Sequence, residues 1–439
     1  MKRIFYLSVF TLTLSGSSLF GATLDGLIKH AMKHSTVVKQ SKAQMELAEA
    51  SREESKAAQF GSIDLVGSYT HFNLPRTLAP LTPASILTDP TAVPTTTNLF
   101  GTGVMYSVPL FTGFAQTRQI EMDSLSTQLS QSKLLLTKEQ LAYNVASLYL
   151  STLALQEMSS AQGKHVSALK KLKGIIQTEV TLGKKAQIDL LKAEKDLYGN
   201  MAYLEVLKGN IAMTKASLAS LVGVNSVGEI TAVKVTVQKP NYSINRLLSE
   251  ATTLHKVQIS DLNIKKATKG IEKSRASKYP QVALNSYYGY NYGENDSSNK
   301  YPGDYNTQEN WQIGFNAKWT LVDFGKSDAS TQKAKIAHMQ ATFEKEQTLL
   351  DLRKSLVEAS EKMKQEYANY QGNLKQYDLA KKSEKIEKVR YHNGVSTIND
   401  LLYATSQTHL SSAKLIESKY NYQKGKFYMD YLLEKGVQK

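Results

Sequence analysis

Apolar residues recur with helical spacing near the middle of the chain. From Leu190 onward the intervals between apolar positions are 3, 4, 7, 3, 4, 7 and 3 residues, which is a heptad pattern. The residues of this seam are Leu190, Ala193, Leu197, Leu204, Leu207, Ile211, Leu218 and Leu221. A similar, less regular spacing joins Ala413, Ile416, Tyr420, Phe427 and Tyr431. Both segments are predicted to be helices that pack along one apolar face.

Two long stretches of the chain can hold uninterrupted helices. The 9 prolines lie at positions 75, 80, 83, 90, 94, 109, 240, 280 and 302, so residues 110–239 and 303–439 contain none. Proline in a helix interior removes a hydrogen bond and kinks the helix, so its absence permits long rods. The apolar pattern breaks at Gly183 and Gly394, which predicts that each stretch forms two antiparallel helices joined by a tight turn.

Four other segments alternate apolar and polar residues, as strands do. They comprise residues 63–70, 104–110, 282–292 and 311–320. Alternation over about ten residues with aromatic residues near the ends fits a membrane β-strand. A strand that is half-buried in a soluble protein has the same pattern. One such segment alone is therefore weak evidence for a membrane strand, and the four segments together favour it.

The order of these elements occurs twice. Residues 183–193 match residues 394–404 at an offset of 211, whereas Phe60 matches Tyr279 at an offset of 219. The difference predicts an eight-residue deletion in a loop of the second copy. We therefore expect a first structural repeat at residues 23–224 and a second at 244–439. A linker at residues 225–243 joins them, and its alternating Val233–Val237 segment suggests a small β element.

The N-terminus has the three parts of an export signal. Lys2 and Arg3 precede the mostly apolar stretch 4–14, and small residues follow up to Ala22. Residues 1–22 are therefore predicted to be a signal peptide. A retained membrane anchor is disfavoured because the apolar run is too short to span a bilayer comfortably.

Composition excludes several kinds of chemistry. The chain has no cysteine, which excludes a disulfide scaffold, a zinc-thiolate site and a cysteine nucleophile. The net charge is +15, but the lysines lie beside acidic residues in helical patterns, so a solvated surface is favoured over nucleic-acid binding. Asp323-Phe324-Gly325 lacks the other kinase motifs, and His30 with His34 supplies two metal ligands at most. We expect no enzymatic activity, no cofactor and no metal.

Four strands are too few to close a transmembrane barrel, for which about eight is the minimum. An open sheet edge in lipid would leave backbone groups without hydrogen bonds. Several copies of a mostly α-helical chain must therefore share one membrane β-barrel.

At this point the sequence resembles the TolC-like outer-membrane efflux proteins, also called outer membrane factors. The resemblance rests on the strand-to-helix motifs at residues 108–113 and 321–325, on the two Gly-x5-Asp-Leu-Leu turns, and on the segment from Tyr391 to Ala404. It implies a homotrimer in the outer membrane with a 12-stranded β-barrel, four strands per chain, that continues into a helical coiled-coil tunnel in the periplasm. Members are passive exit ducts of tripartite efflux or type I secretion systems, and a periplasmic adaptor (membrane fusion) protein joins them to an inner-membrane pump.

The resemblance also implies a site at the periplasmic ends of the hairpins. The expected gate residues are Asp400, Asp189, Tyr391 and Tyr403. A ring of symmetry-related carboxylates favours cations, and a bond from Tyr391 to an aspartate would be a breakable latch. The expected hairpin tips and adaptor contacts are Leu182, Gly183, Lys184, Asn393, Gly394 and Val395. Alternatively, the two aspartates are N-caps of the returning helices.

Two other function classes are compatible with helical rods. One is a trimeric coiled-coil surface protein with a structural or adhesin role, which needs neither the four strands nor the duplication. The other is a periplasmic adaptor, in which a single hairpin is flanked by β segments. Drug, metal, toxin and protein cargoes are equally compatible with this sequence.

Overall fold

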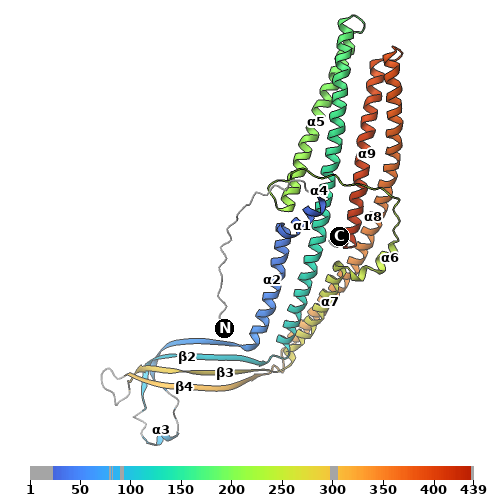
Figure 1. The fold of residues 1–439 in the computed structure, drawn as a ribbon. Helices are drawn as coiled ribbons and strands as arrows, with labels where there is room; N and C mark the ends of the chain where they lie inside the picture. Colours follow the sequence, from blue (N-terminus) through green and yellow to red (C-terminus); the bar gives the residue numbers. More distant parts are fainter. Residues whose placement is uncertain (1–22, 79–80, 82, 89–92, 297–304, 437–439) are drawn as a thin grey trace. The chain divides into compact units, whose positions relative to one another are not determined.

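The computed structural model describes residues 23–78, 81, 83–88, 93–296 and 305–436 (Figure 1). The expected signal peptide, residues 1–22, lies outside the described residues. The chain divides into two compact units. One combines the residues before Gln44 with residues 132–258 and those after Glu346, and the other combines residues 44–131 with 259–346. Each unit thus draws on both halves of the sequence.

Two helical hairpins account for most of the chain. The first consists of α4 (Ala115–Thr181) and α5 (Gln187–Val222), and the second of α8 (Lys326–His392) and α9 (Ile398–Leu432). α4 and α8 both have 67 residues and both begin and end 211 residues apart, as the sequence offset predicts. At 1.5 Å per residue each is about 100 Å long. Of the helices that are described, none is both long and apolar enough to cross a membrane.

The shorter helices precede β1, lie between β1 and β2, or follow the first hairpin. They are α1 (Leu24–His34), α2 (Thr36–Ala57), α3 (Pro83–Thr88), α6 (Ile244–Ser249) and α7 (His255–Ser274), with 3₁₀ turns η1 (Ala58–Phe60), η3 (Ala251–Thr253) and η4 (Arg275–Lys278).

The four predicted strands form one antiparallel sheet in the order β1-β2-β3-β4. Their bounds are β1 (Ser62–Thr77), β2 (Thr95–Phe111), β3 (Gln281–Glu294) and β4 (Tyr305–Lys318). Strand β2 pairs with β1 of the same repeat and also with β3 of the other repeat, so the two repeats meet at the centre of the sheet. The starts of β1 and β3 are 219 residues apart, and the length difference falls in the loop that follows, as expected.

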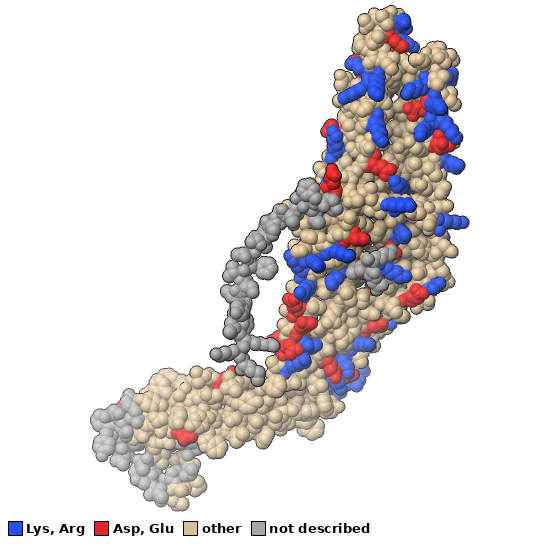
Figure 2. All heavy atoms as spheres, viewed as in Figure 1, with Lys and Arg blue, Asp and Glu red and all other residues tan. Residues whose placement is uncertain are grey.

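The two faces of the sheet differ sharply in polarity. One row across the sheet consists of Leu65, Val104, Tyr288 and Trp311, all of them exposed. A row on the opposite face consists of Ser68, Gly101, Asn291 and Gln308. In Figure 2 Lys and Arg side chains lie over the helices, interspersed with Asp and Glu, whereas the strand region has few charges. The sheet therefore presents an exposed apolar face and a polar face rich in small residues.

The two passages from strand to helix use the same backbone geometry. Gly113 and Phe114 both have positive φ angles, of 62° and 70°, and so do Phe324 and Gly325, at 53° and 89°. A Cβ at Gly113 would lie 2.4 Å from the carbonyl oxygen of Ala276, so only glycine fits there. Each left-handed pair directly precedes a long helix, α4 or α8, and lies in one of the motifs that carry the family resemblance.

Apolar contacts in the first unit form three separate clusters. One surrounds the fully buried Leu27, Tyr149 and Leu218 and includes residues of α1, α4, α5 and α9. A second lies near the turns of both hairpins and a third joins the start of α7 to α8 and α9. Most of the heptad seam of α5, including Leu190, Leu197 and Leu207, is buried as predicted.

The small β element predicted at Val233–Val237 is wrong. Residues 231–240 have no regular secondary structure. The backbone there is instead held by tyrosines: the hydroxyl of Tyr149 donates to the carbonyl of Thr231 at 2.5 Å, and that of Tyr422 donates to Gln238 at 2.6 Å. The valines of the segment pack against the helical clusters, so their alternation reflects burial and not strand pairing.

Candidate functional site

Both hairpins turn through one backbone geometry. Gly183 and Gly394 have φ angles of 71° and 73°, in the left-handed region that favours glycine. The amide of the next residue, Lys184 or Val395, donates to the carbonyl five residues earlier at 2.8 Å in both hairpins. This is the Schellman motif, in which the glycine allows the chain to leave the helix while the last carbonyls stay hydrogen-bonded. The two glycines are therefore required by the turns themselves.

The six residues predicted at the hairpin tips are exposed. They are Leu182, Gly183, Lys184, Asn393, Gly394 and Val395. The apolar side chains of Leu182 and Val395 are 63% and 67% exposed. Each tip thus presents an uncovered apolar side chain next to a glycine.

Asp400 is fixed at the first turn of α9 by a capping box. Thr397 is the N-cap residue, and its side chain accepts from the Asp400 backbone amide at 3.2 Å. In return one carboxylate oxygen of Asp400 accepts from the Thr397 amide at 2.9 Å and from its hydroxyl at 2.7 Å. These bonds lower the pKa of Asp400, first through the Thr397 hydroxyl and then through the Thr397 amide. The carboxylate is therefore charged at neutral pH, and its exposure to water favours the same charged form.

Asp189 occupies the corresponding position of α5 without such bonds. The residue that corresponds to Thr397 is Ala186, whose side chain cannot cap the helix. The Asp189 side chain is partly buried and makes no hydrogen bond or ion pair to any described residue. The alternative in which the aspartates are N-caps is thus wrong: Thr397 and Ala186 are the N-cap residues, and the aspartates lie three positions later.

Tyr391 lies in the apolar cluster near the turns of the two hairpins. Its side chain is only 8% exposed and belongs to the same cluster as Leu190 of α5 and Leu401 of α9. Its hydroxyl is buried and has no hydrogen-bond partner among the described residues. Burial raises the pKa of Tyr391, and the negative charges of Glu179 and Asp189 raise it further.

The structure therefore brings Tyr391 near Asp189 without a hydrogen bond between them. The ammonium group of Lys185 lies over the Tyr391 ring, 4.7 Å from its centroid. Glu179 and Lys185 are contacts that sequence reasoning missed. They belong to the other hairpin and follow no motif, so no pattern in the sequence links them to Tyr391.

Tyr403, the fourth predicted gate residue, is separate from this cluster. It lies one helical turn after Asp400 on α9 and is 68% exposed. Asp400 and Tyr403 thus form an exposed pair on α9, whereas Asp189 and Tyr391 belong to a more buried group. The two aspartates supply negative charge, and Tyr391 supplies contacts that can break. These four residues do not include a nucleophile with an adjacent base. Among the described residues no three His, Asp or Glu side chains gather as metal ligands do.

Solved outer-membrane channels share the fold. The structure of the Campylobacter jejuni CmeC outer membrane channel aligns with a TM-score of 0.76 at 16% identity, covering 94% of this chain and 86% of that chain. For the outer membrane protein VceC of Vibrio cholerae the TM-score is 0.75 at 15% identity, with coverages of 94% and 96%. The open state of the Neisseria gonorrhoeae MtrE outer membrane channel gives 0.74 at 15% identity, with coverages of 94% and 89%. At these identities the likeness concerns the fold.

A comparison with curated proteins gives no match. Residues 27–224 and 245–425 match the family described as Outer membrane efflux protein. These two segments contain all four strands and both hairpins except for the end of α9. The chain therefore belongs to the outer membrane efflux protein family, whose members are channels of the outer membrane.

Proposed function

We propose that the chain is one subunit of a homotrimeric exit duct in a tripartite efflux or type I secretion system. An inner-membrane pump drives the solute, and a periplasmic adaptor joins the pump to the duct. The duct itself is passive, because the sequence has no nucleotide-binding motif.

The observation that carries the proposal is the four-stranded sheet with one apolar face. Among the described strands, β1 pairs only with β2 and β4 only with β3, so both edges are open. In lipid an open edge leaves backbone groups without hydrogen bonds at several kcal/mol each. Because the strands alternate in direction, β4 of one copy can pair antiparallel with β1 of the next. Three copies would close a barrel of 12 strands with the apolar face toward lipid.

Exposed apolar stripes on the long helices support the same association. On α8 the exposed residues follow intervals of 3, 4, 7 and 7 residues: Ile336, Met339, Phe343, Leu350 and Val357. On α5 the exposed apolar residues include Ile188, Leu191, Tyr198, Val206 and Met213. These stripes have the spacing of a coiled-coil seam that lacks its partner helix. Neighbouring copies would cover them and form the wall of a periplasmic tunnel.

The hairpin ends fit the entrance of such a duct. The exposed tips, with Leu182 and Val395 uncovered, are suited to contact with the adaptor. Asp400 is charged and exposed, so three copies would place a ring of carboxylates near the entrance. No comparable observation favours an adhesin or an adaptor, since neither needs a sheet with one apolar face.

Cysteine cross-linking of the sheet edges tests the trimer, and the absence of native cysteine makes each introduced pair specific. Within one chain β1 and β4 are three strand spacings apart, about 14 Å, which is too far for a disulfide. Leu65→Cys in β1 combined in turn with Trp311→Cys, Ile313→Cys or Phe315→Cys in β4 should therefore link different copies. We expect a ladder on denaturing gels that ends at the trimer for one of these pairs.

The control is Leu65→Cys with Val104→Cys, whose residues face each other on β1 and β2 of one chain. That pair should form a disulfide without changing the monomer band. If this control forms and all edge pairs remain monomeric, or if the ladder continues beyond three copies, the closed trimer is wrong.

A further inference from the structure

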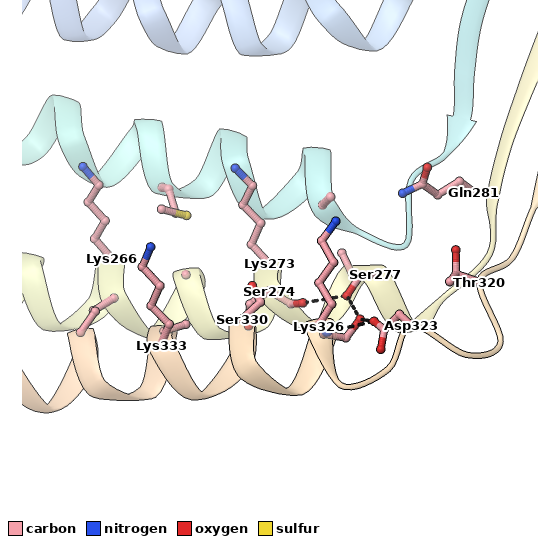
Figure 3. Close-up of a pocket in the computed structure, with 18 of the residues that line it drawn as sticks. Lys266, Lys273, Ser274, Ser277, Gln281, Thr320, Asp323, Lys326, Ser330 and Lys333 are labelled. Atoms are coloured by element: carbon pink, nitrogen blue, oxygen red, sulfur yellow. Dashed lines mark hydrogen bonds between the residues drawn. The ribbon is translucent and has the colours of Figure 1, made fainter.

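A groove in the second unit lies beside the passage from strands to helices. It has a volume of about 950 Å³ and is lined by residues of α4, α7 and α8, of the η4 turn after α7, of the start of β3, and of the connection from β4 to α8. Small residues such as Ala267, Gly270, Ser330 and Ala334 form much of its wall (Figure 3). These short side chains leave room between the longer ones of the same lining.

Four lysines line this groove. Lys266 and Lys273 are seven residues apart on α7, and Lys326 and Lys333 are seven residues apart on α8. Seven residues are about two helical turns, so each pair shares one face of its helix. In Figure 3 all four side chains extend in the same direction from the two helices. Their positive charges are thus concentrated along one groove.

Other basic residues of this unit are neutralised by carboxylates. Arg118 lies 2.8 Å from both Glu121 and Glu272, and Lys269 lies 3.0 Å from Glu121 and 3.2 Å from Glu272. Similar ion pairs join Lys278 to Asp328 and Lys345 to Asp261. Acidic partners are therefore available on these helices.

The groove lysines lack such partners. Lys266, Lys326 and Lys333 form no ion pair with any residue that the structure describes. Lys273 donates to the neutral side-chain amide of Gln119 at 2.5 Å. The carboxylate of Asp323, the acidic residue of the lining, already accepts from the amides of Gly325 and Ser327 at 3.1 and 2.9 Å.

One residue of the groove's lining belongs to the sheet. This residue is Gln281, the first residue of β3. Since side chains alternate along a strand, Gln281 lies on the same face as Asn285 and Asn291, opposite to the exposed tyrosines. In the proposed duct this is the side away from lipid. The lysines would then face the interior, three copies of them around one level of the tunnel.

We propose that this groove is a binding site for multiply charged anionic solutes that pass through the duct. The four ammonium groups outnumber the one carboxylate of the lining, Asp323, so they repel one another, and an anion that carries phosphate, sulfate or carboxylate groups relieves that repulsion. The proposal rests on the proposed function, because the duct is what makes the groove an interior surface. Anionic molecules would then be one substrate class of the duct. They would bind at the groove and not at the hairpin ends, where Asp400 lies.

Titration calorimetry of the full-length protein in detergent with potassium tripolyphosphate tests the site. We expect wild-type protein to bind this trivalent-or-higher anion and Lys266→Gln/Lys333→Gln to bind it about tenfold more weakly, since each lost ion pair weakens association. Binding should also weaken in 1 M KCl because salt screens exposed charges. The matched control is Lys265→Gln/Lys335→Gln, which removes two exposed lysines from the same helices outside the groove.

Three results would overturn the site. If wild-type protein does not bind tripolyphosphate, the groove is not an anion site. If both double variants lose the same binding affinity, the anion binds to diffuse surface charge and not to the groove. If the groove variant keeps tripolyphosphate binding but loses co-purified phosphatidylglycerol, the lysines hold lipid headgroups. A failure of the proposed function is recognised separately: binding without any bilayer current contradicts the duct, whereas current without binding contradicts the groove.

Discussion

At the scale of single residues, Asp400 combines a structural bond with an exposed charge. Its carboxylate accepts the Thr397 amide in the capping box and stays ionised. We predict that Asp400→Ala and Thr397→Ala both destabilise the protein, and that Thr397→Ala does so by about 1 kcal/mol, the usual cost of a lost N-cap. Only Asp400→Ala should lower the cation selectivity of the channel and weaken block by multivalent cations. Thermal unfolding and reversal potentials in planar bilayers measure the two effects.

Thr397→Ala is thus the control for Asp400→Ala, because it breaks the same capping box and leaves the charge. Equal selectivity in the two variants and the wild type would remove Asp400 from the gate. A loss of selectivity in both variants would show that the helix end, and not the carboxylate, governs ion passage.

The proposed role of Tyr391 as a latch can be tested by removing its hydroxyl oxygen. Its hydroxyl is buried without a partner in the described residues and lies near Asp189, and in the proposed latch it would donate to an aspartate when the entrance is closed. We predict that Tyr391→Phe raises the single-channel conductance, because the latch is lost while the ring keeps its packing. Tyr203→Phe is the control, since Tyr203 is exposed on α5 and is not among the expected gate residues. An unaltered closed-state current in Tyr391→Phe would contradict the latch.

At the scale of elements, the turn glycines have an effect opposite to that of helix glycines. Gly183 has a positive φ, whereas Gly174 lies inside α4 with nothing within 4 Å of a Cβ. Gly183→Ala should destabilise the hairpin by about 1 kcal/mol, because alanine is strained in the left-handed region. Gly174→Ala should stabilise it by about 0.5–1 kcal/mol, since alanine favours the helix. Thermal unfolding midpoints that move in the same direction for both variants would contradict this geometry.

A stacked histidine pair joins the two hairpins. His165 of α4 and His409 of α9 have ring centroids 4.7 Å apart and nearly parallel planes, and a Lys419–Glu157 ion pair at 3.0 Å connects the same two helices. Burial lowers the pKa of His165 to about 4, and the charge of His409 contributes to the same shift; burial also lowers the pKa of His409. In the unfolded chain the ordinary value is about 6.5.

Because the unfolded chain binds protons at a higher pH than the folded pair, stability falls as the pH falls from about 6.5 to about 4. We predict that the unfolding midpoint decreases between pH 7.5 and pH 5, and that His165→Gln reduces this decrease by about 2–4 °C. His392→Gln, at the exposed end of α8, should leave it unchanged. The same pH dependence in all three proteins would show that other groups are responsible.

Most elements could be predicted from the sequence because their signals are local. The proline-free stretches and the heptad seam predict the hairpins, and alternation predicts the strands. The segment Val233–Val237 shows the limit of that reasoning. Its alternation matches a strand, but the carbonyls on either side of it, of Thr231 and Gln238, accept hydrogen bonds from Tyr149 and Tyr422, which are far away in sequence. Contacts of this kind depend on the packing of the helices and leave no pattern along the chain.

The same limit applies to the candidate site. The turns with Gly183 and Gly394 could be located because their glycines obey the rules of helix ends. That Thr397 caps α9 follows from a four-residue pattern and could have been recognised. The position of Glu179 and Lys185 beside Tyr391 could not, because it results from the packing of two separate hairpins.

At the scale of the whole molecule, the chain has surfaces that remain incomplete in one copy. The sheet has two open edges and an exposed apolar face, and α8 has an uncovered apolar stripe. Family membership makes the chain a channel of the outer membrane, and these surfaces indicate how copies would assemble around a passage. Several copies would therefore enclose a continuous aqueous duct.

Whether the copies enclose an aqueous duct can be measured as the conductance of the purified full-length protein in a planar bilayer. We predict small, cation-selective currents that trivalent cations block from the side of the hairpin ends, and larger currents for Tyr391→Phe. If folded trimers of wild type and of Tyr391→Phe both insert and carry no current at any salt concentration, the chain does not enclose a duct.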